Sequence, residues 1–260
     1  MPDHAALAAR LRDAYISGSI APLRDGLRPD DLEGAYAIQQ INTHVWVEAG
    51  RRVVGRKIGL TSAAVQAQLG VSQPDFGVLF ADMQTPDGSI FASNELLQPK
   101  IEAEVAIVMG RDLDAEDCST QQFADAASHA VAALEIVDSR IRDWKITIAD
   151  TVADNGSSAR FVVGTVQKPL QGLDLYSCGM VLEVNGEVRS LGAGAACLGH
   201  PLKAGAWLAQ TLARRGTPLR AGDIVLTGAL GPMVALVPGD TVNARIGGLG
   251  SCSVHYAALP

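Results

Sequence analysis

Two glutamates, two positions apart in an apolar run, are the residues of this sequence best placed to do chemistry. Glu102 and Glu104 stand in the segment KIEAEVAIVM, residues 100–109. Successive side chains of a β-strand point to opposite faces, so the two carboxylates would be neighbours on one face. In a partly buried setting their repulsion is relieved by shared protonation or by a divalent cation with oxygen ligands. The pattern indicates a metal site, and the alternative is a half-exposed strand with a polar face.

Further polar residues interrupt segments that otherwise read as apolar strands. Lys57 lies in GRKIGLTS, where a buried lysine would require a partner, and Asp75 lies in QPDFGVLF. Glu135 interrupts the run ALEIV, and Ser157 and Ser158 end a polar loop that leads into a strand. Each residue alone could form a turn, a cap or an ion pair. Together they supply acid, base, hydrogen-bond donors and three carboxylates without a nucleophile, which suits metal-assisted enol or enolate chemistry.

The elements that must position these residues are predicted from periodicity. The first 50 residues are predicted to be helical, with a second helix over residues 31–48. After residue 52 come short β-like runs separated by Gly, Pro and Asp, namely VVGRKIGL, DFGVLFADM, SIFA and IEAEVAIVMG. Phe123, Ala127 and Val131 recur at helical spacing and predict a helix over residues 120–133, followed by a strand over 133–137. A last helix over 204–214 and the strands AGDIVLTG and DTVNARI complete the prediction, with a boundary near residue 50.

Composition indicates a globular enzyme and argues against several other classes. The chain has 260 residues, 48% of them hydrophobic, and a formal net charge of -7. It has no basic run interleaved with aromatic residues, so nucleic acid is not an expected partner. It has no apolar run long enough to span a membrane and no apolar N-terminal segment, so we expect a cytoplasmic protein with no membrane partner. The four cysteines lie far apart without a CxxC pair and are predicted to be core residues.

Familiar catalytic signatures are absent from the sequence. It contains no GxSxG elbow and no P-loop, and the glycine-rich stretch LGAGAACLG lacks the GxGxxG spacing. Serine hydrolysis and nucleotide binding are therefore disfavoured. Among the histidines, His200 in LGHPLKAG is the one in a turn-like setting, and a surface or capping role is expected for it.

Several ordered motifs together resemble a known family. They are GRKIGLTS, QPDFGVLFADM, PKIEAEVAIVMG, ALEIVDSRI, DWKITIADTVADNGSS, GDIVLTGALGPM and PGDTVNARIGGLGS. From about Asp31 onward they look like the 2-keto-4-pentenoate hydratase group of the fumarylacetoacetase-like superfamily. The resemblance implies an α+β fold with a mixed β-sandwich or roll core and peripheral helices. With the change of sequence pattern near residue 50, we expect an N-terminal helical segment, residues 1–50, and a fumarylacetoacetase-like catalytic domain, residues 51–260.

The resemblance also implies a site and a function. It assigns one Mg2+ or Mn2+ ion to Glu102, Glu104 and Glu135. Active-site roles fall on Lys57 and Asp75, and substrate contacts on the loop of Ser157 and Ser158. The segments VLFADM and TGALGPM resemble the hydratases and offer an apolar wall for the substrate: Leu79, Phe80, Met83, Leu230 and Met233. The implied protein is a metal-dependent hydro-lyase of aromatic meta-cleavage catabolism, acting on 2-hydroxypenta-2,4-dienoate as a homo-oligomer.

Three alternatives to that activity stay open from the sequence. Two belong to the same family: a 4-oxalocrotonate decarboxylase and a 2-oxohept-4-ene-1,7-dioate hydratase. The third is a noncatalytic partner subunit on the same fold, against which the intact set of carboxylates and the lysine argue. A decarboxylase substrate carries a second carboxylate that a cationic surface should recognise, whereas the pentadienoate ends in an uncharged carbon that needs an apolar wall.

The expected chemistry follows from the substrate. A 2-hydroxy-2,4-dienoate offers a carboxylate oxygen and the adjacent C2 oxygen to a divalent cation, which stabilises negative charge. Protonation at C5 gives the 2-oxo-3-enoate, and water then adds at the electrophilic C4 to give 4-hydroxy-2-oxopentanoate. Lys57 would supply a positive charge and Asp75 would transfer protons or activate water, although the two roles could be interchanged.

Overall fold

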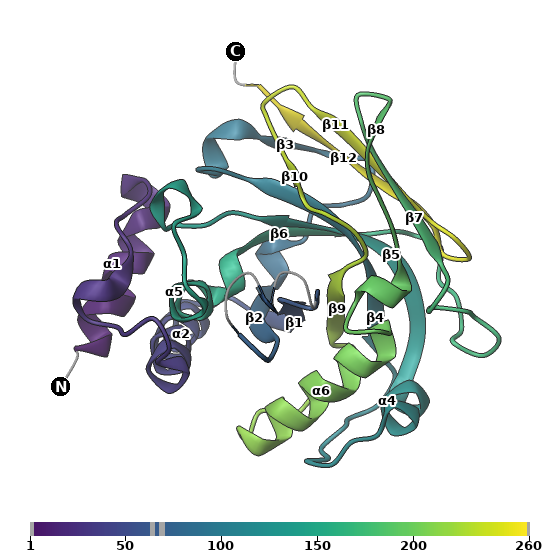
Figure 1. Ribbon diagram of the computed structural model, residues 1–260, viewed down its shortest axis with the longest axis horizontal. Coiled ribbons are helices and arrows are strands. Elements are labelled where there is room, and N and C mark those ends of the chain that lie inside the picture. Colours follow the sequence, from purple (N-terminus) through teal and green to yellow (C-terminus); the bar gives the residue numbers. More distant parts are fainter. Residues whose placement is uncertain (1–2, 63–65, 68–70, 259–260) are drawn as a thin grey trace.

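The computed structural model describes residues 3–62, 66–67 and 71–258 of the chain, and two β-sheets with helices around them make up its architecture (Figure 1). The α-helices are α1 (His4–Ser17), α2 (Leu32–Glu48), α4 (Thr120–Ala126), α5 (Ile148–Ala153) and α6 (Pro201–Arg214). Short 3-10 turns are η1 (Leu23–Asp25), η2 (Ala81–Met83), η3 (Ser93–Glu95), η4 (Arg142–Trp144), η5 (Asn155–Ser157) and η6 (Gly194–Ala196). None of the helices in the described residues is both long and apolar enough to cross a membrane.

The larger sheet carries the predicted site residues. Its strands are β1 (Val53–Gly59), β2 (Asp75–Phe80), β4 (Lys100–Met109), β5 (Ala127–Val137), β6 (Ser158–Val163), β9 (Ile224–Ala229) and β10 (Val234–Ala235). Their order is β2-β1-β9-β4-β5-β6, with β10 paired to the start of β4. The β1–β9 pair is parallel and the other pairs are antiparallel, so the sheet is mixed.

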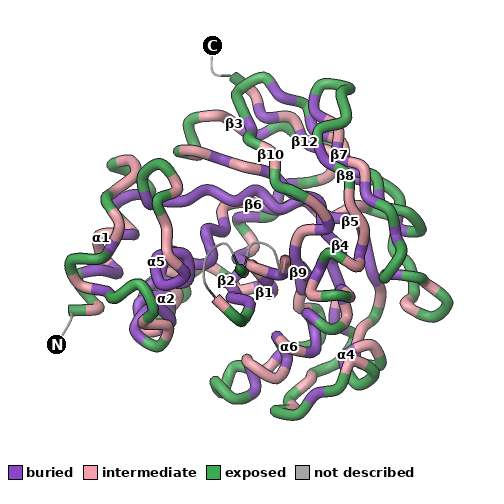
Figure 2. Tube along the Cα trace, in the orientation of Figure 1, coloured by how far each residue is buried: buried purple, intermediate pink, exposed green. Residues whose placement is uncertain are grey.

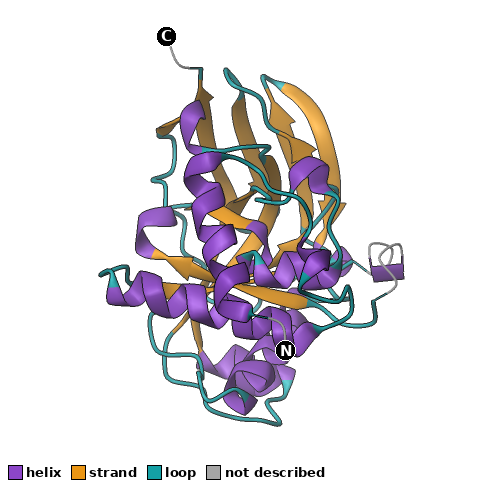
Figure 3. Cartoon of the chain, turned by 90° about the vertical axis from the view of Figure 1, so that its left-hand side faces the viewer, coloured by secondary structure: helices purple, strands orange, loops and turns teal. Residues whose placement is uncertain are grey.

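The smaller sheet packs against the larger one. Its strands are β3 (Ile90–Ala92), β7 (Gly179–Val184), β8 (Glu187–Ala193), β11 (Thr241–Ile246) and β12 (Gly250–Ala257), in the order β3-β12-β11-β7-β8. Strands β11 and β12 contact β5. Turned by 90°, the molecule presents its helices in front of the strands (Figure 3). The predicted α+β fold with mixed sheets and peripheral helices is confirmed.

The central strands of the larger sheet are covered on both faces, as the largely purple tube there shows (Figure 2). In β4, Ile101, Ala103 and Val105 enter the main apolar cluster, whereas Ala106 on the other face enters a second, smaller cluster. The alternation expected of a strand therefore directs Glu102 and Glu104 away from the main core, on the face of the smaller cluster.

The N-terminal helices form as predicted and pack onto the strands that follow them. Tyr36 of α2 stacks on Phe76 of β2 with the ring centroids 4.7 Å apart. The Gln39 side chain donates hydrogen bonds to the carbonyls of Phe76 and Val152, each at 2.9 Å. The predicted boundary near residue 50 falls between α2 and β1. Helix α2 thus fixes β2 and α5, which both border the predicted site.

The predicted helix over residues 120–133 is wrong in its second half. Helix α4 ends at Ala126, and β5 begins at Ala127 and pairs with β4 on one side and β6 on the other. A strand covered on both faces is apolar at nearly every position, so Phe123, Ala127 and Val131 match a helical spacing by coincidence. Pairing with two neighbouring strands outweighs the local helix preference of an alanine-rich segment.

Two smaller expectations from the sequence are confirmed. His200 caps the start of α6, where its Nδ1 accepts a hydrogen bond from the backbone N–H of Leu202 at 3.0 Å. All four cysteines are buried free thiols, as predicted for core residues.

A buried ion pair ties the loop after β5 to α5. Arg140 and Asp154 each have side chains only 1% exposed, and Arg140 Nε donates to Asp154 Oδ1 at 2.6 Å. The same guanidinium donates to the carbonyls of Asp154, at 2.8 Å, and of Ser158, at 3.3 Å. The pair therefore fixes the start of β6 relative to the end of β5, where the predicted site residues lie.

We expect Asp154→Ala to destabilise the fold by about 3–5 kcal/mol, because it leaves the Arg140 guanidinium buried without its counter-charge. Urea unfolding followed by circular dichroism measures this loss. The control is Arg220→Ala, which removes the exposed ion pair with Asp112 and should cost less than about 1 kcal/mol. Equal losses in the two variants would contradict the structural role of the buried pair.

Candidate metal centre and active site

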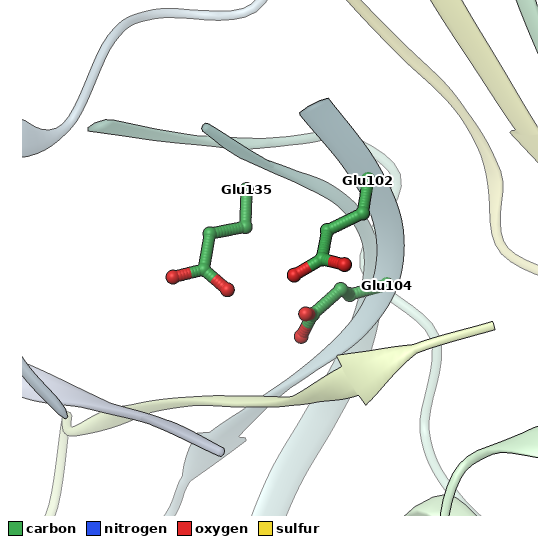
Figure 4. Close-up of side chains that lie close together, drawn as sticks. All are labelled: Glu102, Glu104 and Glu135. Atoms are coloured by element: carbon green, nitrogen blue, oxygen red, sulfur yellow. The ribbon is translucent and has the colours of Figure 1, made fainter. Parts of the chain in front are cut away.

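Three glutamates from two adjacent strands converge at one point of the larger sheet. Glu102 and Glu104 extend from β4 and Glu135 extends from β5 (Figure 4). The antiparallel register pairs Glu102 directly with Glu135. Each residue offers a carboxylate oxygen within 4.8 Å of those of the other two. The structure thus brings together all three predicted metal ligands.

The three glutamates are buried, and two of their oxygens lack hydrogen-bond partners among the described residues. Glu104 and Glu135 are fully buried, and Glu102 is 8% exposed. Glu104 Oε2 accepts a hydrogen bond from Gly228 N at 2.7 Å, whereas Glu104 Oε1 and Glu135 Oε2 have no hydrogen-bond partner among the described residues. Burial, followed by the neighbouring charge of Glu135, raises the pKa of Glu102 to about 7 and that of Glu104 well above its ordinary value. Buried, mutually repelling carboxylate oxygens are the donor set that Mg2+ and Mn2+ prefer, so the cluster fits a divalent cation.

Lys57 supplies a positive charge beside this cluster. Its side chain on β1 is buried, and Nζ lies 3.3 Å from Glu135 Oε1. Burial by itself would lower the pKa of Lys57, but the carboxylates of Glu135 and Asp75 outweigh burial and raise it. The ammonium group is therefore held in its charged form, ready to bind an anion.

Asp75 lies opposite Gly59 in the pairing of β1 with β2 and is only 1% exposed. Neither of its carboxylate oxygens has a hydrogen-bond partner among the described side chains and backbone groups. Burial raises its pKa, against the opposing effect of Lys57. A Cβ at position 59 would approach Asp75 Oδ1 to 2.1 Å, so a larger residue there would displace the Asp75 carboxylate. Asp75 thus has a raised pKa and free oxygens, the properties of a group that transfers protons.

A cavity of about 390 Å3 connects these groups. Its polar lining includes Lys57, Asp75, Glu102 and Ser157. The larger part of its wall is apolar and includes Ile58, Leu60, Val137, Trp144, Ile146, Ala196, Ala229, Pro232 and Met233. Lys57 is the one basic side chain among the described lining residues. The cavity therefore has a charged region at Lys57, Asp75 and Glu102, and the rest of its described wall has no second cation.

The two predicted serines have different places. Ser157 lines the cavity, and its Oγ has no hydrogen-bond partner in the described structure. Ser158 Oγ instead donates to Glu135 Oε1 at 3.3 Å and supports the carboxylate cluster. Asn155, Gly156 and Ser157 all have positive φ, between 55° and 62°. The Asn155 amide holds this strained turn by accepting from Val78 N at 2.7 Å and donating to Val78 O at 2.9 Å.

Most of the predicted apolar wall lies elsewhere. Leu79, the predicted substrate contact, is fully buried in the smaller core cluster and does not line the cavity. Phe80, Met83 and Leu230 are likewise core residues, and of this set Met233 alone lines the cavity. Part of the wall comes instead from Trp144 and Ile146 in the loop after β5. Periodicity did not identify these residues because they lie outside regular strands.

The fold and the buried carboxylate cluster define a divalent-metal-binding enzyme of the α+β class, and comparison with known proteins makes the class more specific. The chain belongs to the fumarylacetoacetate (FAA) hydrolase C-terminal family, whose model matches residues 52–255. The resemblance found in the sequence is thereby confirmed.

Individual relatives cover almost the whole chain. The 2-keto-4-pentenoate hydratase of Burkholderia vietnamiensis is 59% identical over 97% of both chains. The TodF product hydratase of Pseudomonas putida is 52% identical, over 95% of this chain and 92% of its own. Among solved structures, the 4-oxalocrotonate decarboxylase from Pseudomonas putida G7, complexed with magnesium and adipate, matches 97% of both chains with a TM-score of 0.93 and 37% identity.

We expect Glu104→Gln to weaken Mg2+ binding at least about tenfold while the metal-free protein keeps or gains stability. The substitution removes one of three buried like charges, which lessens their repulsion but deletes a ligand oxygen. Calorimetric Mg2+ titration and thermal unfolding in EDTA measure the two effects. Glu187→Gln, at the exposed first residue of β8, is the control and should change neither. Unchanged Mg2+ affinity in Glu104→Gln would remove this residue from the ligand set.

Proposed function

We propose that this protein is a metal-dependent hydro-lyase that adds water to 2-hydroxypenta-2,4-dienoate and gives 4-hydroxy-2-oxopentanoate in aromatic meta-cleavage catabolism. The observation that carries the proposal is the buried cluster of three glutamates, with Lys57 and Asp75, at a largely apolar cavity. Relatives of 52% to 59% identity bear the names of hydratases, which supports the same reaction here.

The three glutamates would hold Mg2+ or Mn2+. Such a cation, when bound, supplies Lewis-acid stabilisation of negative charge on the oxygens of the 2-oxo acid. Lys57 carries a fixed positive charge next to Glu135 and would bind the carboxylate or enolate end of the substrate. Ser157, with its free Oγ in the cavity, would donate a hydrogen bond to the same end. These groups orient the substrate with its carbon chain toward the apolar wall.

Asp75 is the group we assign to proton transfer. Burial raises its pKa, so Asp75 would hold a proton more readily than an exposed aspartate, and it would deliver that proton to C5 of the dienol as the C2 hydroxyl loses its own and becomes the 2-oxo group. The resulting carboxylate would then accept a proton from the water that adds at C4. Solvent water, which takes up the C2 hydroxyl proton in the first step, would return a proton to C3 and complete the 4-hydroxy-2-oxo acid. One carboxyl group with a raised pKa thus serves as acid and base in turn.

The apolar wall supports hydration over decarboxylation. A second carboxylate placed among Val137, Ile146 and Met233 would be desolvated without a partner, which is costly. The uncharged end of the pentadienoate has no such cost.

We further propose that the protein is a cytoplasmic homo-oligomer. Four buried free thiols are usual for a reducing compartment. Strand β8 is an edge of the smaller sheet and exposes Val188 and Leu191, at 53% and 63%, which supports association between copies. Light scattering on the purified protein tests this assembly. A mass equal to that of a single subunit would contradict it.

We expect the purified protein with Mg2+ to remove the ultraviolet absorbance of 2-hydroxypenta-2,4-dienoate and to form 4-hydroxy-2-oxopentanoate, because its cavity suits a monocarboxylate. Parallel assays measure CO2 release from 4-oxalocrotonate, and the two reactions are compared as kcat/KM. A higher kcat/KM for CO2 release would assign the decarboxylase activity instead, and loss of neither substrate would favour a noncatalytic subunit.

We expect Asp75→Asn to lower kcat by about 10²-fold or more with little change in KM, since it removes proton transfer in the transition state. Lys57→Ala should lower kcat and raise KM, because the lysine contacts the anion in both the ground state and the transition state. Steady-state kinetics with Asp30→Asn and Lys203→Ala as exposed controls provide the measurement. Near wild-type kcat in Asp75→Asn would exclude this residue from the mechanism.

A further inference from the structure

Trp144 separates the enclosed cavity from a second, more open groove. The groove has a volume of about 530 Å3, and its lining includes Lys100, Leu97 and Tyr256. Trp144 lines both the cavity and the groove, whereas Lys100 lines only the groove. The indole ring is therefore a partition with an ammonium group on its outer side.

The partition is built from strained backbone that several hydrogen bonds hold in place. Asp143 and Trp144 have φ values of 58° and 55°, a left-handed conformation that costs a non-glycine residue on the order of 1–3 kcal/mol. Trp144 Nε1 donates to the carbonyl of Gln98 at 3.0 Å, and the Asp143 N–H donates to Gln98 Oε1 at 3.1 Å. Gln98 Nε2 in turn donates to the carbonyls of Ser139 and Ile141, at 2.7 and 2.6 Å. These hydrogen bonds to Gln98 and within the loop after β5 therefore hold the indole in one position.

Lys100 stands in line with the metal centre. It precedes Glu102 by two residues on β4, so Lys100, Glu102 and Glu104 follow one another along one face, at roughly 6–7 Å per step. Its Nζ lies 4.3 Å from the centroid of the Trp144 ring, in a cation–π contact. Val137 of the cavity wall and Ala235 of the groove are its partners on the two neighbouring strands. The outer end of the cavity therefore lies at the start of β4, beside a cation that the indole covers.

We propose that Trp144 is the specificity-determining residue of this site, because its indole masks the Lys100 ammonium and presents an apolar surface to the far end of the substrate. The inference rests on the proposed function, in which the 2-oxo acid end of the substrate lies at the glutamates. A monocarboxylate then ends against the ring. A dicarboxylate one carbon longer would direct its second carboxylate at the ring face, with Lys100 on the wrong side to pair with it.

Removing the indole should reverse this preference. In Trp144→Ala the Lys100 side chain loses its cation–π partner and gains open space toward the cavity. A distal carboxylate could then form a charge-assisted hydrogen bond instead of being desolvated without a partner. The cation needed to recognise a dicarboxylate is thus already present in this chain, and one aromatic side chain keeps it out of the cavity.

The test uses two ligands that differ only at the far end, 2-oxohexanoate and 2-oxohexanedioate. Their dissociation constants are measured by calorimetry with Mg2+ present. We expect the wild-type protein to favour the monocarboxylate. The preference for the dicarboxylate relative to the monocarboxylate should rise by about tenfold or more in Trp144→Ala, the usual scale for pairing a charged group. Trp144→Phe, which keeps an aromatic ring, should retain most of the wild-type preference.

Lys100→Met distinguishes masking of the ammonium from a simple gain of space. In the Trp144→Ala background, Lys100→Met should abolish the increased preference for the dicarboxylate. In the wild-type background, Lys100→Met should leave the ligand preference unchanged, because the covered ammonium does not reach the ligand. An unchanged preference in a folded Trp144→Ala protein, or an increase that survives Lys100→Met, would overturn the proposal. If Trp144→Ala does not fold, weaker dicarboxylate binding by the single Lys100→Met variant would overturn it instead.

The same proteins are assayed for hydration of the dienoate. Absence of hydration by the wild-type protein, together with the expected shift in ligand preference, would reject the proposed function and leave the role of Trp144 standing. Hydration by the wild-type protein without the expected shift in ligand preference would support the proposed function and reject the role of Trp144.

Discussion

Repulsion among three buried carboxylates is the constraint on which the rest of this structure depends. Glu102, Glu104 and Glu135 bring like charges together where water cannot screen them, and the fold supplies few groups to offset this. Lys57 contacts one carboxylate oxygen and Gly228 N–H another. A site left with oxygens that lack donors is destabilising unless a cation occupies it, so the metal requirement and the stability of the central sheet are linked.

The surrounding elements can be understood as supports for that arrangement. Asn155 fixes the turn that carries Ser157, and the Arg140–Asp154 pair anchors the beginning of β6 next to Ser158. Both supports use side chains that are hydrogen-bonded within the protein, whereas Asp75, Glu104 and Glu135 keep oxygens without a hydrogen-bond partner among the described residues. Rigid, satisfied polar groups thus surround reactive, unsatisfied ones, which is how a protein holds functional groups in energetically unfavourable positions.

The sequence predicted the strands that carry charge more reliably than it predicted their surroundings. A glutamate in an apolar run is conspicuous, so Glu102, Glu104 and Glu135 drew attention in the sequence, and the family resemblance then assigned them as metal ligands. Local patterns cannot report which strands pair, and for that reason β5 was divided between a helix and a strand. The hairpin of β7 and β8 was not predicted, although Asn185-Gly186, both with positive φ, is the dipeptide preferred in a two-residue turn. Leu79 was predicted to contact the substrate but lies in the core, and Trp144, for which no role was predicted, lines the cavity, because side-chain exposure depends on packing between distant segments.

The register between β4 and β5 makes the metal centre a product of long-range pairing. Glu102 faces Glu135 across the ladder, and a slip of one residue would turn one set of carboxylates to the opposite face. Neither strand alone carries all three ligands. A chain that is unfolded, or whose strands pair in the wrong register, therefore cannot bind the metal ion tightly. Free metal ions in the cell can therefore select the correctly paired sheet after it has formed, but they cannot nucleate it. The metal content of a preparation sets a lower limit on the fraction of molecules whose central strands are in register.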